Sequence, residues 1–302
     1  MRDLIATQCP VCLSDTEDHE VYPSNVHREE LTPEIFTARR VPDRTHYRMV
    51  ICRRCGLMRA DPVLEEGTVG AFYRDSHGQD AEVTRYAAET YAGYFRRYYA
   101  RIPTQAHILE IGCGNGGFLR ELLKNKFSNV YAVEPSVKTV AQAGELKGLI
   151  YNGMFGPGLY PADHFDLICA FHVFDHVCDP LQFLQDCRRY LKKAGELFLI
   201  VHDISAWPAR VLGRACPMVD IGHPFLYNAL TLTKLLEANG FEVQKRFRVE
   251  DHYPLRYWAR LMPLPGVVKR PLLAWLQKST LGQTPLTLGL GNMGVVARKK
   301  DG

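Results

Sequence analysis

The stretch 107–119 constrains the fold more than any other part of the sequence. An apolar run ends there at four closely spaced glycines, and apolar residues then return at helical spacing, at Phe118, Leu119, Leu122 and Leu123. This pattern predicts a strand, a tight loop and a helix in succession. Glycines suit such a loop because the backbone turns sharply and a ligand can approach the main chain where no Cβ projects.

The charge beside this loop separates two classes of ligand. Gly112, Gly114 and Gly117 satisfy the dinucleotide pattern G-x-G-x-x-G, and the acid Glu134 follows at the usual interval. Glu110, however, places a carboxylate just before the first glycine. A carboxylate there would repel the pyrophosphate of a dinucleotide, whereas it would attract a ligand that carries an ammonium and a sulfonium cation.

The order Glu-Ile-Gly-Cys-Gly-Asn-Gly-Gly at 110–117 resembles the cofactor loop of class I S-adenosylmethionine-dependent methyltransferases. In that family the acid and the glycine backbone hold the methionine moiety. Glu134 ends the predicted second strand at the topological switch point, where it could accept both ribose hydroxyls; a surface carboxylate at a helix start is the alternative. Met154 and Phe155, in the predicted third strand, would flank the adenine. The cofactor contacts that the resemblance implies are Glu110, Gly112, Cys113, Gly114, Asn115, Gly116, Glu134, Pro135, Met154, Phe155, Phe171 and His172. A nicotinamide site and a purely structural loop are the alternatives.

A second motif, Phe-His-Val-Phe-Asp-His-Val-Cys-Asp-Pro at 171–180, carries the same resemblance. It follows a predicted strand at 165–171, whose end would face the transferred methyl group. His172 could line the cofactor pocket or act as a general base, because imidazole titrates near neutrality. With Asp175 and His176 it also resembles the acid and histidine cluster that holds a divalent metal in some quinone-pathway O-methyltransferases. A packing role at the start of the next helix is the alternative for His176.

A third segment, from 223 to 243, resembles the histidine-aromatic turn, helix and strand of zinc-ribbon sugar C-methyltransferases. In those enzymes a histidine-rich turn supplies the base that removes a proton from the carbon to be methylated. Only His223 has a counterpart here, with Tyr227 nearby. The predicted catalytic residues are therefore His223, His172, His176 and Tyr227, and the fifth strand would bring His202 and Asp203 to the same rim.

Two C-x-x-C pairs near the amino terminus predict a structural zinc site. Cys9 and Cys12 form the first pair and Cys52 and Cys55 the second, each beside a proline or glycine. Four thiolates suit tetrahedral zinc and leave no open position for catalysis. Because such a site exists only in the folded state, metal binding would stabilise a segment with a small core.

Arginine is frequent in the stretch of about twenty residues from 39 to 59, which begins between the two cysteine pairs and ends just after the second. The arginines of this interval are Arg39, Arg40, Arg44, Arg48, Arg53, Arg54 and Arg59. They predict either a solvated face or a grip on a phosphate-bearing acceptor, such as a nucleotide-linked sugar or RNA. The net charge of +4 is mild and does not demand nucleic acid as a partner.

Strands and helices alternate from residue 107 onward, which predicts an α/β fold with a parallel sheet and helices on both faces. The resemblance implies a Rossmann-like, doubly wound, seven-stranded sheet, whose antiparallel last strand would be Gly-Val-Val-Ala-Arg-Lys at 294–299. We expect a zinc ribbon at 1–62, a helical connector at 63–104, and a methyltransferase domain at 105–302 with insertions near 204–228 and 253–287. The third strand is predicted at 148–155, and Gly195 is predicted to end the helix that follows the second motif. The apolar, basic-flanked insertion at 253–287 could be a lid, a contact in a homodimer, or a patch for a lipid-linked substrate at a membrane surface.

These patterns together predict a cytoplasmic enzyme. No run of about eighteen apolar residues occurs, and the amino terminus lacks the apolar stretch of a signal peptide. We expect S-adenosylmethionine-dependent methylation of a small-molecule acceptor, a sugar carried on a nucleotide or a lipid, with a histidine base. The alternatives are an rRNA or tRNA methyltransferase whose zinc module grips RNA, and a binding protein that keeps the cofactor fold without catalysis.

Overall fold

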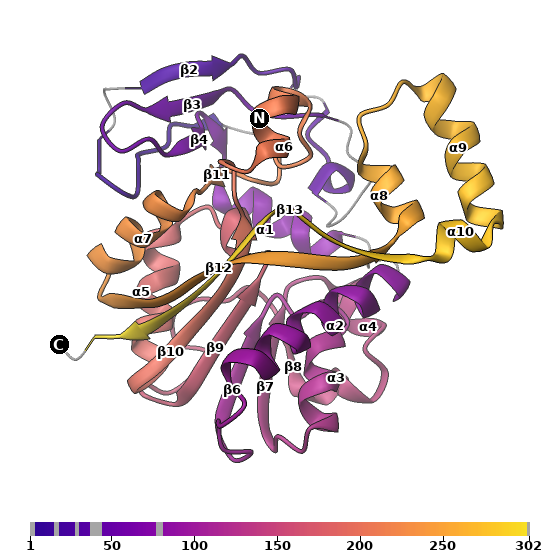
Figure 1. Cartoon of the computed structure of the whole chain (residues 1–302). Helices are drawn as coiled ribbons and strands as arrows, with labels where there is room; N and C mark the ends of the chain where they lie inside the picture. The colour runs from indigo at the N-terminus through magenta and orange to yellow at the C-terminus, as the bar shows by residue number, and fades with distance from the viewer. Residues whose placement is uncertain (1–3, 15–17, 28–29, 37–43, 77–80, 301–302) are drawn as a thin grey trace.

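A seven-stranded sheet forms the centre of the computed structural model, which describes residues 4–14, 18–27, 30–36, 44–76 and 81–300. Its strand order is β12-β13-β10-β9-β6-β7-β8 (Figure 1). The strands are β6 (His107–Ile111), β7 (Asn129–Glu134), β8 (Ile150–Asn152), β9 (Phe165–Phe171), β10 (Leu191–His202), β12 (Phe241–Pro254) and β13 (Pro285–Lys299). Only β13 runs antiparallel to its neighbours in this sheet. The predicted Rossmann-like sheet with an antiparallel last strand is confirmed.

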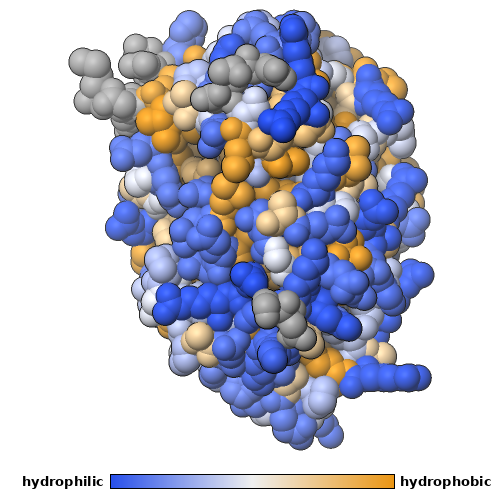
Figure 2. All heavy atoms as spheres, turned by 90° about the vertical axis from the view of Figure 1, so that its left-hand side faces the viewer, coloured by the Kyte–Doolittle hydropathy of each residue, from blue (hydrophilic) through white to orange (hydrophobic). Residues whose placement is uncertain are grey.

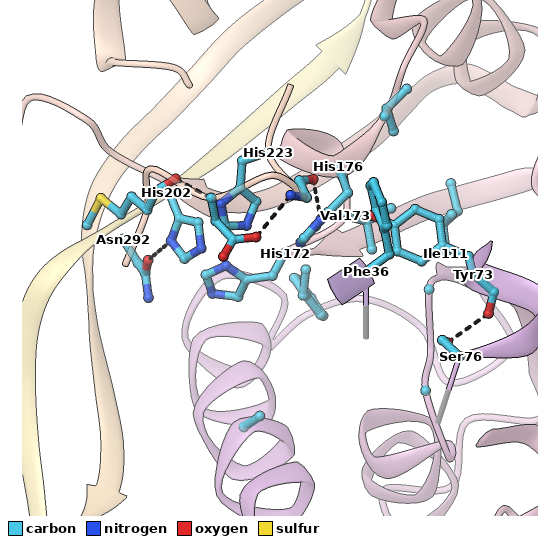
Figure 3. Close-up of a pocket in the computed structure, with 18 of the residues that line it drawn as sticks. Phe36, Tyr73, Ser76, Ile111, His172, Val173, His176, His202, His223 and Asn292 are labelled. Carbon is cyan, nitrogen blue, oxygen red and sulfur yellow. Dashed lines mark hydrogen bonds between the residues drawn. The ribbon is translucent and has the colours of Figure 1, made fainter. Parts of the chain in front are cut away.

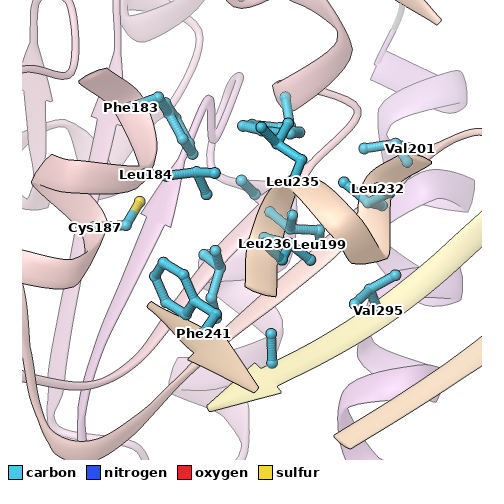
Figure 4. Packing of buried hydrophobic residues seen from close by; sticks show 14 of the residues in the cluster. Phe183, Leu184, Cys187, Leu199, Val201, Leu232, Leu235, Leu236, Phe241 and Val295 are labelled. Atoms are coloured by element: carbon cyan, nitrogen blue, oxygen red, sulfur yellow. The ribbon is translucent and has the colours of Figure 1, made fainter. Parts of the chain in front are cut away.

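Helices cover both faces of this sheet. They are α2 (Ala81–Tyr98), α3 (Gly117–Lys124) and α4 (Val137–Ala141) on one side and α5 (Pro180–Tyr190) and α7 (Ala229–Ala238) on the other (Figure 1). Successive side chains of a strand point to opposite faces, so Ile108 packs with α2 and α3 whereas Leu109 packs with α5 and α7. Figure 4 shows the cluster on the side of Leu109, in which side chains of α5 and α7 pack against Leu199 and Val201 of β10.

Local sequence explains where α5 begins, and tertiary pairing explains where it ends. Asp179 caps the helix, since its Oδ1 accepts hydrogen bonds from the amides of Leu181 and Gln182 at 3.1 and 3.0 Å, and a proline occupies the first turn. The predicted stop at Gly195 is wrong. The helix ends at Tyr190 and the chain enters β10 directly, because the buried Leu191 already pairs with β9.

The remaining predicted bounds agree with the structure to different degrees. The strand predicted at 165–171 coincides with β9, whereas β8 is shorter than the predicted 148–155. The last strand, predicted at 294–299, corresponds to the end of β13, which begins earlier, at Pro285. These differences lie at element ends, where pairing with a neighbour outweighs local preference.

The amino-terminal segment forms a second, four-stranded sheet of order β11-β4-β3-β2. Its strands are β2 (Asp18–Tyr22), β3 (Met49–Cys52), β4 (Met58–Ala60) and β11 (Phe225–Leu226), and a further pair joins β1 (Leu4–Ile5) to β5 (Val63–Leu64). The strand β11 comes from the predicted insertion near 204–228 and pairs with β4. The domain bounds at 62/63 and 104/105 stay predictions, because this sheet combines strands from distant parts of the chain.

The other helices lie in the connector and in the two insertions. They are α1 (Glu66–Asp75), α6 (Trp207–Leu212), α8 (Leu255–Leu261), α9 (Gly266–Lys278), α10 (Thr280–Gln283) and the 3-10 turns η2 (Pro33–Phe36), η3 (Gly144–Leu149), η4 (Phe174–His176) and η5 (Gly213–Ala215). Helices α8 to α10 project from the sheet as a lobe between β12 and β13 (Figure 1). Across the described residues, no helix combines the length and apolar character needed to cross a membrane.

Candidate active site

A cavity of about 790 Å³ lies at the carboxyl ends of β6, β7, β9 and β10. This is the edge at which open α/β sheets bind ligands. The glycine loop and its acids line one part of the cavity, a group of histidines lines another, and α8 contributes to the wall. Figure 3 shows the imidazoles on one side and Phe36, Tyr73 and Ile111 on the other.

The glycine loop adopts a backbone that side chains would obstruct. Gly112 has a φ of +70°, and a Cβ on it would collide with the side chain of Val173. Gly114 has a φ of +58° with open space where a Cβ would stand, and Gly116, at +77°, is the N-cap residue of α3. The amide of Gly112 donates to the carbonyl of Val133 at 2.8 Å, which ties the loop to the end of β7. The loop therefore leaves a cradle beside the sheet that a ligand can fill.

Two buried carboxylates stand beside this cradle. Glu134 accepts hydrogen bonds from the amides of Gly114 and Ser136, each at 2.9 Å. Glu110 is 4% exposed, and among the described residues its Oε2 has no hydrogen-bond partner. Burial, together with the charge of Glu134, raises the pKa of Glu110 well above its usual range, and burial also raises that of Glu134. Two buried acids, one with an oxygen that has no hydrogen-bond partner among the described residues, would suit a positively charged ligand such as S-adenosylmethionine.

Four histidines surround the buried carboxylate of Asp175 at the other part of the cavity. The ring centroids of His172 and His202 lie 4.7 Å apart, those of His202 and His223 4.8 Å, and those of His176 and His223 4.5 Å. Although burial opposes it, the charges of the surrounding imidazoles hold the pKa of Asp175 below its usual range. Burial, reinforced by His223, lowers the pKa of His176 to about 4.

Hydrogen bonds at Nδ1 orient three of these rings. Nδ1 of His176 lies 2.7 Å from the carbonyl oxygen of Gly222, and Nδ1 of His223 lies 2.9 Å from that of Met218. Nδ1 of His202 lies 2.7 Å from Oδ1 of Asn292. Since a carbonyl oxygen only accepts, each Nδ1 donates, and in the neutral ring Nε2 is the basic atom. Asn292 in turn donates to Asp251 at 2.6 Å, so a chain of hydrogen bonds holds the ring of His202.

The fourth histidine, His172, sits at a strained position at the end of β9. Its φ is +53°, which is uncommon for a residue other than glycine, and its amide donates to the carbonyl of Ile200 at 2.7 Å. One ligand atom each of His172, Asp175 and His202 lies within 4.8 Å of the other two. Two imidazoles and a carboxylate at such distances could hold a divalent cation.

The structure brings most of the predicted site residues to the cavity. His172, His176 and His223 line it, but Tyr227 does not: this residue is fully buried and its ring stacks on Phe174 at 5.2 Å. Of the predicted cofactor contacts, ten line the cavity and two do not. The ten are Glu110, Gly112, Cys113, Gly114, Glu134, Pro135, Met154, Phe155, Phe171 and His172; the two are Asn115 and Gly116.

Sequence reasoning missed Asn292. This residue reaches the histidines because β13 pairs antiparallel with β10 in a register that places Asn292 opposite His202. No local sequence pattern predicts that register, because His202 and Asn292 lie far apart in the chain.

The described arginines of the amino-terminal segment are not arranged to bind a phosphate in the cavity. Arg59 is buried and forms an ion pair with Asp18, and Arg48 contacts Asp61 at 2.6 Å. None of the described arginines of that interval lines the cavity. Arg39 and Arg40 lie outside the described residues.

The four cysteines of the two C-x-x-C pairs converge. Cys9 and Cys55 have their sulfurs 3.4 Å apart, as do Cys12 and Cys52, and all four sulfurs lie within 4.8 Å of one another. Four thiols at these distances fit the donor set of a tetrahedral metal.

Comparison with known proteins identifies the family. A model of the methyltransferase-domain family matches residues 83–246, more than half of the chain. The chain belongs to this family. Its domain is a class I S-adenosylmethionine-dependent methyltransferase domain, and S-adenosylmethionine is the cofactor that the family implies.

Among the relatives of this methyltransferase is a protein of Mycolicibacterium smegmatis named as a probable S-adenosylmethionine-dependent methyltransferase. It is 31% identical over 169 residues, which cover 52% of this chain and 62% of that protein. A ubiquinone biosynthesis O-methyltransferase of Histophilus somni is 32% identical over 36% of this chain and 51% of its own. A tRNA U34 carboxymethyltransferase of Alteromonas mediterranea is 30% identical over 45% of each. The chain thus spans 45–62% of the length of these relatives.

Solved structures agree in fold. The YcgJ protein of Bacillus subtilis superposes with a TM-score of 0.50 at 17% identity, covering 70% of this chain and 98% of that one. A Bacillus halodurans protein gives a TM-score of 0.51 at 14% identity, covering 70% and 99%. At these identities the likeness shows the architecture alone.

Proposed function

We propose that this methyltransferase transfers a methyl group to an oxygen or carbon of a small molecule, a sugar carried on a lipid or a nucleotide, with a histidine as general base. The observation that supports this most directly is that the acid-flanked glycine loop and the histidines open into one cavity. A cofactor held at the loop and an acceptor beside the imidazoles would share that space. Most of the acceleration would then come from orienting the two reactants.

At the cofactor end, Glu110 would bind positive charge and Glu134 the ribose. S-adenosylmethionine, when bound, supplies an electrophilic methyl group on a sulfonium. The positive charge of such a ligand would favour ionised Glu110 and offset the burial that raises its pKa in the free protein. The cradle at Gly114 would let the ligand lie against the backbone.

At the acceptor end, His223 is the base that we favour, through Nε2. Its Nδ1–H donates to the Met218 carbonyl, which fixes the ring with Nε2 as the proton acceptor. Proton uptake would create an imidazolium close to buried Asp175, whose negative charge would stabilise it. His176 and His202 flank the same ring, and because the pKa of His176 is lowered to about 4, His202 is the neighbour to which the proton could pass.

The walls of the cavity favour an acceptor with an apolar part. Tyr257, Trp258 and Leu261 of α8 line it, together with Met262 just beyond the helix. Of the arginines that might have held phosphates, those in the described part of the chain are engaged elsewhere or do not line the cavity. Both observations support a lipid-linked sugar over a nucleotide-linked one.

We also propose that the four cysteines Cys9, Cys12, Cys52 and Cys55 bind one structural zinc ion. The sulfurs converge as a closed set of four, which leaves no position for a reacting ligand. The ion would hold the turn of the β3–β4 hairpin against the preceding cysteine pair and so stabilise the small sheet.

The test has two stages. Calorimetric titration with S-adenosylmethionine and, separately, with NADH should show binding of the first alone. The loaded protein is then offered lipid-linked sugars, nucleotide-linked sugars and tRNA, and formation of S-adenosylhomocysteine is measured. His223→Asn should reduce turnover of the accepted substrate by roughly 10²-fold or more without weakening cofactor binding, whereas His19→Asn, an exposed histidine of β2, should change neither. Binding of NADH alone, or full activity of His223→Asn, would overturn the proposal.

A further inference from the structure

We propose that the lobe formed by α8, α9 and α10, residues 255–284, docks on an anionic membrane surface and turns the cavity toward the bilayer. Docking itself does not depend on the proposed acceptor; the advantage of presenting a lipid-linked substrate to the cavity rests on the proposed function. The argument uses the apolar side chains of the lobe, its charge, and its position.

The lobe exposes large apolar side chains together. On α9, Val267 is 84% exposed and Trp275 56%, and Val268 is exposed as well. At about 100° per residue these three side chains fall within roughly one third of the helix circumference. On the same count Leu276, the buried residue of this helix, lies opposite Val267 and about 80° from Val268. Met262 before α9 and Leu281 in α10 extend the exposed apolar surface.

The charge of the lobe is one-sided. The sequence contains no aspartate or glutamate from 252 to 300, and the lobe carries Arg256, Arg260, Lys269, Arg270 and Lys278. These five positive charges exceed the net charge of +4 of the whole chain, so the rest of the protein has a net charge of −1. Arg256 forms an ion pair with Glu82 of α2, so docking would depend on the other four. Burial and the nearby charges of Arg44 and Arg260 lower the pKa of Lys269, as expected where cations crowd together.

An exposed apolar helix face bordered by lysine and arginine is the pattern of a protein segment that lies in the interface of an anionic bilayer. Trp275 and Val267 would enter the headgroup region while the basic side chains contact lipid phosphates. By contrast, the face in Figure 2, on the side of Figure 1 away from the lobe, is covered mainly by hydrophilic residues.

The position of the lobe joins the docking surface to the cavity. Trp258 and Leu261 of α8 line the cavity, as do Met262 and Pro263 in the link to α9. The indole Nε1 of Trp258 donates to the carbonyl of Leu286 at 3.1 Å and so attaches α8 to β13. The exposed face of α9 thus lies a short stretch of chain from the cavity wall.

Charge also argues against a second copy of the chain as the occupant. A symmetric dimer through this face would bring Arg260, Lys269, Arg270 and Lys278 of two lobes together without acidic partners from either lobe. An anionic lipid surface complements both the charge and the apolar side chains.

Sedimentation with lipid vesicles tests the proposal, with the full chain and no acceptor. We expect binding to phosphatidylcholine vesicles that contain about 30% phosphatidylglycerol, little binding to pure phosphatidylcholine, and loss of binding as salt rises. Trp275→Asp and Lys269→Glu/Arg270→Glu should each lower the partition coefficient about tenfold or more. Matched controls are Val211→Asp, at a residue of α6 that is 72% exposed, and Lys147→Glu in η3.

Cofactor binding, measured in parallel, shows that each variant is folded. Equal binding of wild type to neutral and anionic vesicles, no binding to either, or equal losses in the control variants would overturn the proposal. A lobe variant that instead converts a lipid-free dimer into a monomer, by light scattering, would assign the face to self-association and overturn it too. Failure of methyl transfer leaves the vesicle measurements unaffected, so the two proposals fail separately.

Discussion

Replacement of Glu110 by glutamine should weaken cofactor binding and stabilise the free protein at the same time. The change keeps the size of the side chain and removes one buried negative charge. A hydrogen bond to a charged group contributes about 1.5–3 kcal/mol. Since about 1.4 kcal/mol corresponds to a tenfold change, the affinity for S-adenosylmethionine should fall roughly 10- to 150-fold.

The effect on stability has the opposite sign. Burial and Glu134 raise the pKa of Glu110 above 4.5, so the folded state binds this proton more tightly than the unfolded chain. The contribution of Glu110 to the free energy of unfolding is therefore present below pH 4.5 and is lost as pH rises through the raised pKa. At pH 7.5 Glu110→Gln should unfold at a higher urea concentration than wild type.

Calorimetry gives the affinity and urea denaturation the stability, each with Glu145→Gln, an exposed acid of η3, as the control. Cofactor affinity within threefold of wild type would refute the assignment of Glu110 to a cation. A free protein destabilised by the substitution would refute the reasoning about its burial.

Three further predictions follow from the site and the cysteines. Lowering the pH from 6.5 to 4 should reduce the free energy of unfolding by up to about 3 kcal/mol through His176. The pKa of His176 in the folded protein is about 4, so the unfolded chain binds that proton more tightly. Urea denaturation should show a smaller loss in His176→Gln. Cys12→Ser should lose zinc, measured by mass spectrometry of the metal, and lower the melting temperature, whereas Cys178→Ser should retain the metal. Gly112→Ala should abolish cofactor binding in calorimetry, because a Cβ there meets Val173 in a left-handed backbone conformation; normal affinity would contradict the role given to the loop.

Short-range sequence patterns were enough to predict several elements of the fold. The strand at 165–171 was predictable because it is buried on both faces and reads as an apolar run, and the Asp179-Pro180 pair marks a helix start wherever it meets a helical pattern. The stop predicted at Gly195 failed because pairing of Leu191 with β9 draws the chain into a strand before the glycine is reached.

Some residues of the candidate site could be predicted from neighbouring sequence, and others only from the tertiary structure. Glu110 and the glycines lie within a few residues of one another, so their common geometry follows from one strand and one turn. The histidines lie on separate elements, and only the order of β9, β10 and β13 in the sheet brings them together and adds Asn292. Tyr227, close to His223 in sequence, instead turns into the core against Phe174.

The sequence by itself determined the family, the glycine loop and the cysteine pairs, because those signals depend on residues that are neighbours in the chain. Only the tertiary structure decided which histidines share a cavity, which arginines are engaged in ion pairs, and that α9 leaves its apolar face exposed. These depend on strand order, register and burial, which are set by long-range packing free energy rather than by any local pattern.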